Sequence, residues 1–381
     1  MLVKLGDVGN IIIGKTPKTS KKENYSSNDI CFITTEDLKK GFKITKTNRY
    51  ISKIGFEEIK NNSIKGTSIV VSCVGSDMGN VGITNMTCAT NQQLYSITNI
   101  NSKHNPYYLY YVLKLKKDYF RQIAGNTAMP ILPKSDFENI MLDLPPLEIQ
   151  NKIASILSSI DNQIERNTAM VKKLQVLSQG IFNKLFSDET NNISLLDFPY
   201  IQIIKPGISK FEGTKHYIAT AEVDNEKVNY NAPLIDFDTR ENRANMQPVK
   251  NSVWFAKMKN SLKHIYISDA DSMMCSNYIF STGFTGIKCD DFAFEYLVNF
   301  INMPYFENKK NILSHGATME GVNNEDLKSI QIPLPSKDKL IIFHNKVKEI
   351  HYQTTKLNEQ TFKLNVLKEK LLPLLINGQL I

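Results

Sequence analysis

The chain has 381 residues, of which 41% are hydrophobic and 22% are charged. This composition fits about two globular domains and contains too little charge for a disordered chain. The longest apolar runs, such as Ile11–Ile13 and Ile69–Val71, fall far short of the ~18 residues that a membrane span needs. The amino terminus also lacks the basic and apolar regions of a signal peptide. The sequence therefore predicts a soluble, cytoplasmic protein with no membrane partner.

The net charge of +8 is unevenly distributed along the chain. Residues 1–144 contribute +7, residues 145–186 +2, residues 187–332 −5 and residues 333–381 +4. Basic surface attracts phosphate backbones, but a lysine-rich face is more often only solvated, so charge alone indicates nucleic acid weakly. The five cysteines form no C-x-x-C pair and the six histidines form no H-E-x-x-H motif, which argues against disulfides and a bound metal.

Two stretches, residues 1–144 and 187–332, have the character of mixed α and β bodies. Short runs rich in β-branched and aromatic residues are broken there by Gly, Asn and Pro, which predicts strands. The clearest predicted strands are Ile30–Thr35, Thr67–Val74, Leu94–Thr98, Ser252–Ala256 and Ile265–Ser268, and the clearest predicted helices are Tyr107–Gln122 and Phe292–Asn302. The polar stretch Ser187–Asn192 is predicted to link the first half of the chain to the second.

A long helix is predicted after each body, starting near Pro145-Pro146 and near Pro335. Apolar or neutral residues recur there at alternating spacings of four and three, which is the heptad pattern of a coiled coil. The first seam is Ile153, Leu157, Ile160, Ile164, Asn167, Val171, Leu174, Ser178, Ile181 and Leu185, and the second is Phe343, Val347, Ile350, Thr354, Leu357, Thr361, Leu364, Lys368, Leu371 and Leu375. Some 40 helical residues extend about 60 Å, so two such helices packed together would set the spacing of the bodies.

The whole chain is an internal repeat. At a shift of 190 residues, Asp136–Pro145 lies over Asp326–Pro335 and Leu174–Leu177 over Leu364–Leu367, and at a shift of 191 Gly125-Asn-Thr127 lies over Gly316-Ala-Thr318. Such a repeat predicts two copies of one plan. We expect an α+β fold in which two α/β bodies alternate with two heptad helices, packed as an antiparallel coiled coil with a pseudo-twofold repeat.

Residues 9–16 match the phosphate-loop pattern G-x-x-x-x-G-K-[ST] letter for letter. That loop needs flexible backbone before a helix that begins at the lysine. Here Ile11–Ile13 favour an extended strand, and Pro17 follows where an amphipathic helix should begin. A nucleotide-dependent enzyme therefore stays as an alternative hypothesis, which predicts that Lys15→Ala abolishes ATP binding.

Asn105-Pro-Tyr-Tyr108 is similar to the N/D-P-P-Y/F motif with which adenine-N6 methyltransferases hold a flipped base. The second proline is missing, and no G-x-G cofactor loop precedes the motif. We therefore interpret Asn105 as an ordinary helix cap. No serine or cysteine triad can be assembled from local signatures, so the chain is predicted not to be an enzyme.

Several short motifs follow one another in a characteristic order. They are Leu5-Gly-Asp7-Val8, Gly14-Lys-Thr16-Pro17, Asn91-Gln-Gln93, Gly125-Asn-Thr127 and Leu144-Pro-Pro-Leu-Glu148-Ile-Gln150. In this order, and together with the repeat, they make the whole chain resemble the specificity subunit of Type I restriction-modification systems. The second body departs from the pattern, because it lacks the Gly-x-Thr-Pro stretch and its helix opens with Leu334-Pro-Ser-Lys337.

The resemblance implies four segments with distinct roles. Residues 1–144 and 187–332 would be target recognition domains, each reading one half of a split site in double-stranded DNA. Residues 145–186 and 333–381 would be conserved spacer helices that dock two modification subunits, which carry S-adenosylmethionine and methylate adenine N6. Restriction (motor-nuclease) subunits can join this core. The chain itself would bind no cofactor and no metal.

Candidate DNA contacts were chosen by residue type and setting. Basic and hydroxyl side chains suit phosphates, Asn and Gln suit adenine, Glu accepts from cytosine N4, and Arg suits guanine O6 and N7. The candidates are Lys15, Thr16, Lys18, Ser20, Lys21, Thr34, Thr35, Glu36, Asn91 and Gln92 in the first body and Arg240, Asn242, Arg243, Lys257 and Lys259 in the second. Two further alternatives stay open, which are the specificity chain of a bipartite Type II system and a coiled-coil scaffold that ignores DNA.

Overall fold

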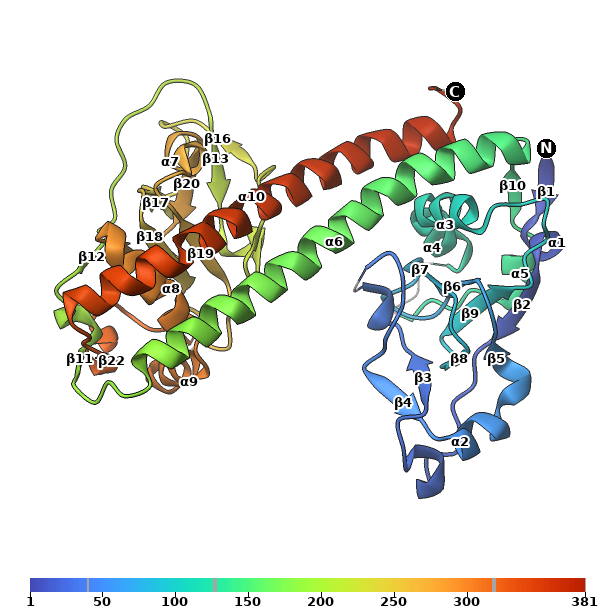
Figure 1. Ribbon diagram of the computed structural model, residues 1–381. Coiled ribbons are helices and arrows are strands. Elements are labelled where there is room, and N and C mark those ends of the chain that lie inside the picture. Colours follow the sequence, from blue (N-terminus) through green and yellow to red (C-terminus); the bar gives the residue numbers. More distant parts are fainter. Residues whose placement is uncertain (40, 126–128, 317–319, 381) are drawn as a thin grey trace. The chain divides into compact units, whose positions relative to one another are not determined.

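The computed structural model describes residues 1–39, 41–125, 129–316 and 320–380. The chain forms two compact units: unit 1 comprises Met1–Arg166 with Lys363–Ile381, and unit 2 comprises Asn167–Phe362. Each unit combines sheets with helices (Figure 1), so the predicted α+β class is confirmed. None of the helices in the described ranges is long and apolar enough to cross a membrane.

Unit 1 is built on two four-stranded sheets and a strand pair, counting its described residues. The first sheet is antiparallel, in the order β2 (Asn10–Ile13), β9 (Leu94–Thr98), β6 (Ser68–Ser72) and β7 (Val81–Thr84). The second has the order β4 (Arg49–Ile51), β3 (Ile30–Ile33), β8 (Cys88–Thr90) and β5 (Ser63–Ile64), with β3 and β8 parallel. The pair joins β1 (Leu2–Lys4) to β10 (Met141–Asp143).

The helices of unit 1 pack on both sheets: the second helix in chain order packs against β4 of the second sheet, and the others contribute to the core of the first sheet. These helices are α1 (Leu5–Val8), α2 (Lys53–Glu58), α3 (Pro106–Leu115), α4 (Lys117–Ile123) and α5 (Lys134–Glu138), with 3-10 turns at Lys22–Tyr25, Asp37–Lys39 and Lys60–Asn62. Helix α3 is almost wholly buried between the first sheet and the long helix α6 (Leu147–Phe186). The Asn105 side chain accepts hydrogen bonds from the backbone N–H of Tyr107 and Tyr108, so its interpretation as a cap is confirmed.

Unit 2 repeats this plan from its own strands. Its first sheet has the order β12 (Ile201–Ile203), β21 (Phe284–Cys289), β18 (Ser252–Ala256) and β19 (His264–Ile267), and its second has β16 (Leu234–Ile235), β13 (Lys215–Ile218), β20 (Tyr278–Ser281) and β17 (Ala244–Met246). The pair β11 (Asn192–Ser194) and β22 (Gln331–Pro333) corresponds to β1 and β10, and β13 and β20 are the parallel neighbours. A small hairpin, β14 (Val223–Asp224) with β15 (Lys227–Val228), has no counterpart among the strands described for unit 1.

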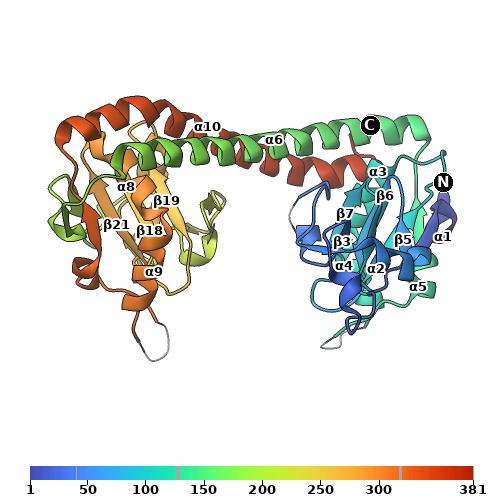
Figure 2. The same ribbon diagram turned by 60° about the horizontal axis from the view of Figure 1, so that its bottom comes forward.

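The helices of unit 2 also pack on both of its sheets: the first helix in chain order packs against β20 of the second sheet, and the others contribute to the core of the first sheet. These helices are α7 (Ser272–Asn277), α8 (Phe294–Ile301), α9 (Pro304–Leu313) and the long α10 (Lys337–Ile376), with 3-10 turns at Leu195–Asp197, Thr220–Glu222, Asp291–Ala293 and Asp326–Ser329. Figure 2 shows α8 between the strands β18 and β21 and the long helices. Because sheet order and parallel pair agree in both units, the predicted internal repeat is present in the fold.

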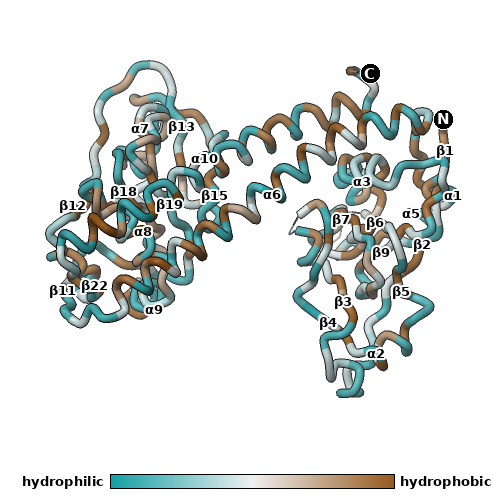
Figure 3. The backbone as a smooth tube through the Cα atoms, viewed as in Figure 1, coloured by the Kyte–Doolittle hydropathy of each residue, from teal (hydrophilic) through white to brown (hydrophobic). Residues whose placement is uncertain are grey.

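The long helices pack against each other in both units, and they do so antiparallel. In unit 1, Leu157 near the start of α6 shares a core with Leu372 and Leu375 near the end of α10. In unit 2, the rings of Phe182 near the end of α6 and Phe343 near the start of α10 lie 5.8 Å apart. All predicted seam residues are buried or half-buried, and hydrophobic and hydrophilic residues alternate along both helices (Figure 3).

Two polar clusters tie the long helices to the bodies. In unit 1, Asp161 of α6 accepts hydrogen bonds of 2.7 Å from Lys368 Nζ of α10 and from the Tyr111 hydroxyl of α3. In unit 2, Ser178 of α6 is hydrogen-bonded to Asn299 of α8 and lies 3.0 Å from His351 Nε2 of α10. Asp161 and His351, like Ser178 and Lys368, are 190 residues apart, so one position of the repeat carries an ion pair in unit 1 and neutral groups in unit 2. Burial lowers the pKa of His351 to about 4.

The structure corrects some predicted boundaries. The helix predicted over Tyr107–Gln122 is two helices that meet at Lys116, and the predicted strands Ile30–Thr35 and Thr67–Val74 are shorter at one or both ends. Residues 9–16 contain strand β2 and no helix begins at Lys15, so the phosphate-loop interpretation is wrong. The motif residues Asn126, Thr127, Ala317 and Thr318 lie outside the described residues.

Candidate nucleic-acid interface

Three loops of unit 1 meet at the same end of its sheets. Gly14, which follows β2, donates its N–H to Leu94 O, and Asn91 in the β8–β9 turn donates its N–H to Ile33 O at the end of β3. The Thr16 hydroxyl donates a 2.6 Å hydrogen bond to Gln92 Oε1. The structure therefore brings together candidates that are far apart in sequence. We call residues 14–17, 34–37 and 91–93 the unit 1 loop surface.

Within this surface, Gly14 packs tightly against Thr90 and Asn91 of the β8–β9 turn. A Cβ at this position would lie 2.1 Å from Asn91 O and 2.2 Å from Thr90 Oγ1, which no real side chain tolerates. Glycine therefore lets the loop after β2 pass directly against the β8–β9 turn. On the outside of this contact Lys15, Glu36 and Gln92 are exposed, whereas Thr16, Thr34, Thr35 and Asn91 are half-buried.

Some of the candidate side chains hold the loops together. The backbone N–H and the hydroxyl of Thr34 both donate to Asp37 Oδ2, at 2.9 and 3.0 Å, and Asp37 Oδ1 accepts from Asn48 N. The Asn91 amide donates to Gln93 Oε1 at 3.0 Å. Thr34 thus acts as a turn-forming residue, while Thr35, Glu36 and Gln92 are the side chains that this arrangement leaves at the rim.

The basic arm at residues 18–22 is fixed by a carboxylate that the sequence analysis missed. Glu58 accepts hydrogen bonds from the backbone N–H of Lys18, from the Asn24 amide and from Lys21 Nζ. The hydrogen bond from Lys18, followed by that from Asn24, lowers the pKa of Glu58 to about 2. Lys18 and Ser20 remain exposed, but part of the Lys21 charge is neutralised by its 3.2 Å ion pair with Glu58.

Unit 2 has a surface at the corresponding position, around the β20–β21 turn. Thr282 donates its N–H to Arg243 O, and Lys257 donates its N–H to Gly283 O. A Cβ on Gly283 would lie 3.6 Å from Arg243 Nη2 and 3.0 Å from Thr220 Cγ2. Lys263 donates from Nζ to Thr220 O at 2.7 Å. We call Arg243, Lys257 and Lys263 the unit 2 basic cluster.

The cluster places positive charges close to one another. Burial lowers the pKa of Lys257, and the nearby charge of Arg243 lowers it further. Two positive groups that repel each other favour an anionic or electron-rich partner. The overall charge of −5 in residues 187–332 therefore conceals a local basic surface.

The other candidates in unit 2 have different surroundings. The Arg240 guanidinium lies 4.0 Å from the centre of the Phe237 ring and donates to Phe237 O. Lys259 Nζ forms a 2.7 Å ion pair with Glu320, and Asn242 is exposed. Arg240 and Lys259 thus differ from Arg243, although the same sequence signal selected all three.

Comparisons with known proteins agree with this architecture. Residues 1–175 match the family of Type I restriction modification DNA specificity domains. The specificity subunit of the Type I restriction enzyme HindI from Haemophilus influenzae is 36% identical over 193 residues, which cover 49% of this chain and 40% of that protein. The MjaVIII specificity subunit from Methanocaldococcus jannaschii is 30% identical over 191 residues, covering 49% and 41%. In both cases this chain spans less than half the length of the relative that it matches.

Two longer matches extend into the second half. The putative MjaX specificity subunit of Methanocaldococcus jannaschii is 24% identical over 311 residues, covering 73% of this chain and 69% of that protein. The crystal structure of the Type I restriction-modification S subunit from M. genitalium superposes with a TM-score of 0.63 at 15% identity, covering 98% of this chain and 95% of that one. This likeness shows a shared fold.

Residues 1–175 thus belong to the family of Type I restriction modification DNA specificity domains, and the whole chain shares the fold of a Type I S subunit. In such a system the specificity subunit is the non-catalytic component, so the polar side chains of its loop surfaces are candidates for binding rather than for catalysis. No group of three or more His, Cys, Asp or Glu side chains that could hold a metal ion occurs in the described part of the chain.

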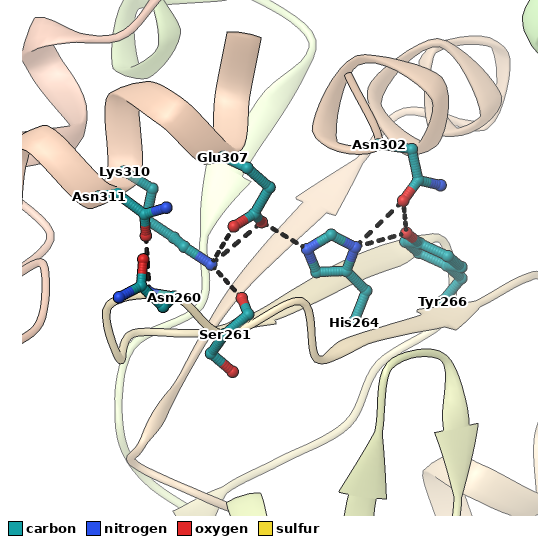
Figure 4. Close-up of polar contacts among 8 residues, drawn as sticks. All are labelled: Asn260, Ser261, His264, Tyr266, Asn302, Glu307, Lys310 and Asn311. Atoms are coloured by element: carbon teal, nitrogen blue, oxygen red, sulfur yellow. Dashed lines mark hydrogen bonds and ion pairs between the residues drawn. The ribbon is translucent and has the colours of Figure 1, made fainter. Parts of the chain in front are cut away.

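In unit 2 a buried ionic network supports the loop that carries Lys257 (Figure 4). Lys310 of α9, which is fully buried, forms a 2.8 Å ion pair with Glu307 and donates to Ser261 O in the loop after β18. Glu307 Oε1 also lies 2.9 Å from His264 Nε2, and the Asn260 N–H donates to Asn311 Oδ1. In unit 1, the exposed Arg121 of α4 donates a hydrogen bond to Ser76 O in the loop after β6.

Proposed function

We propose that this chain binds double-stranded DNA sequence-specifically, with each unit reading one half of a bipartite target that has a fixed gap. The main support is that both units repeat one strand order and carry polar loops at the same end of it. A tandem of equivalent surfaces suits a target with two separate parts. The family assignment gives independent support for DNA as the ligand.

Within this proposal the four predicted segments keep their roles. Residues 1–144 and 187–332 are the target recognition domains, and residues 145–186 and 333–381 are the spacer helices. The spacers dock two modification subunits, which bring S-adenosylmethionine to the target adenine, and through them restriction subunits. The assembly works in the cytoplasm, where the DNA lies. The antiparallel packing and the burial of the seam residues support the spacer role.

Contacts to DNA divide into those that position the protein and those that specify bases. Exposed Lys15 of the unit 1 loop surface would hold phosphates together with Lys18, Ser20 and Lys21 of the basic arm. Thr35, Glu36, Asn91 and Gln92 would face base edges, and in unit 2 Asn242 with the unit 2 basic cluster would do both. Rigid loops suit this task, because groups that are already fixed lose little conformational freedom on binding.

The proposal is tested by mapping N6-methyladenine across the genome of a methylation-free bacterial host. The chain is expressed with the modification subunit that is encoded beside it, and the control lacks this chain. We expect methylation at one split motif with a constant gap. A co-purifying complex that methylates no such motif would contradict the proposal and favour the coiled-coil scaffold, while the neighbouring genes distinguish a Type I from a bipartite Type II system.

A further inference from the structure

The same position of the repeat has different chemistry in the two units. In unit 1 the β8–β9 turn and its neighbours present amide and hydroxyl groups, from Asn91, Gln92 and Thr16. In unit 2 the β20–β21 turn is flanked by the cations Arg243 and Lys257. Amides combine donors with acceptors, whereas guanidinium and ammonium groups are donors alone. The two surfaces should therefore select base edges of different kinds.

Arg243 is the arginine of unit 2 that is available for a ligand. Residues 167–362 contain two arginines, Arg240 and Arg243. Arg240 is stacked on Phe237 and donates to its carbonyl oxygen. Arg243 is exposed, and within the described ranges its guanidinium takes part in no ion pair. Its donors are free to bind a partner in a bidentate manner.

The backbone of Arg243 is nevertheless fixed. Its carbonyl oxygen accepts hydrogen bonds from Thr282 N at 2.8 Å and from Asn245 N at 2.9 Å. The next residue, Ala244, begins strand β17 and is paired with Ser281 of β20. The Arg243 side chain therefore extends from a rigid edge strand and passes close to Gly283. Because Gly283 has no side chain, the Arg243 guanidinium is not obstructed there.

Base edges in the major groove differ in what they offer to such a group. Guanine presents two acceptors, O6 and N7, which match the paired donors of arginine, whereas adenine presents an acceptor beside a donor. The neighbouring Lys257 adds positive charge and so further favours the edge that carries only acceptors. We propose that Arg243 reads a guanine in the half-site bound by unit 2. This inference rests on the proposed function.

The test compares methylation motifs made by the wild-type chain, Arg243→Ala and Arg243→Gln, each expressed with its modification subunit. We expect a guanine in one half-site of the wild-type motif. Arg243→Ala should remove the requirement for it and lower methylation of the original sites by about 5- to 150-fold, the discrimination carried by one bidentate contact. Arg243→Gln should shift preference at this position toward adenine, and the other half-site should stay unchanged in both variants.

Lys288→Ala is the control, because Lys288 is an exposed cation of unit 2 near the end of β21 that lies away from the β20–β21 turn. Melting temperatures within about 2 °C of wild type would show that the variants fold. A split motif that both Arg243 variants leave unaltered would overturn the inference and leave the proposed function standing. A loss of methylation that leaves the guanine requirement intact would also overturn it, since a phosphate contact weakens binding without changing which bases are preferred. Absence of any split motif with the wild-type chain would refute the proposed function itself.

Discussion

At the scale of single residues, the candidate interface depends on where a side chain is absent as much as on where one is present. Gly14 allows the loop after β2 to touch the β8–β9 turn, and that contact places Thr16 against Gln92. The hydrogen bonds of Thr34 and Glu58 then fix the flanking segments. Such residues contact no ligand in the proposed function, but they determine the geometry of those that do.

Gly14→Ala should therefore destabilise unit 1. Its methyl group would overlap Asn91 O, so the backbone must move, and overpacking of this kind costs about 1–3 kcal/mol. Urea denaturation followed by circular dichroism measures the change. Gly180→Ala is the control, since no atom lies within 4 Å of the added Cβ on α6, and alanine should stabilise that helix by about 0.5–1 kcal/mol. Equal effects of the two substitutions would contradict this account.

Prediction from sequence worked for some residues and failed for others for a physical reason. Lys15, Thr16, Asn91 and Gln92 carry local turn and charge signals, so they were recognised, but their mutual contact arises from strands that pair over about 80 residues. Glu58 acts through long-range hydrogen bonds and carries no local signal. Arg240 and Lys259 were selected as DNA contacts by residue type, as Arg243 was. In the structure Arg240 contacts Phe237 and Lys259 is paired with Glu320, and the sequence around them does not reveal these contacts.

At the scale of elements, the heptad pattern was the most reliable sequence signal. The pattern depends only on residues three and four positions apart within one helix. In the structure every predicted seam residue is buried or half-buried. The polar residues within the seam also have a role that periodicity could not reveal. Lys368 is hydrogen-bonded to Asp161, which also accepts from Tyr111 of α3, and Ser178 contacts both Asn299 of α8 and His351 of α10, so each polar cluster joins three elements at one point.

Lys368→Met should strongly destabilise unit 1. The Lys368 side chain is 14% exposed and its partner Asp161 5%, so the substitution leaves a buried carboxylate without its cation, which typically costs about 3–5 kcal/mol. Chemical denaturation of the full chain provides the measurement. The double variant Asp161→Asn with Lys368→Met should recover much of the loss. If the single variant were as stable as the double one, the ion pair would not have the role assigned here.

At the scale of the whole molecule, the long helices are continuous through both units. Under the proposed function their length sets the gap between the half-sites. Inserting one heptad into both α6 and α10 should therefore lengthen the gap in the methylated motif while leaving the bases of each half unchanged. Methylation mapping of the insertion variant gives the answer, with a variant that carries a heptad in α6 alone as a mismatched control. An unchanged gap would refute this role of the helices.

The strand pairs β1–β10 and β11–β22 each close one of the two bodies. Each pair brings the first and the last strand of a body side by side. Under the proposed function, exchange of one body at this strand pair would replace the reader of one half-site and leave the sequence of the long helices as it is. The loops of a body would then set the target, whereas substitutions in the seam would be limited by its packing.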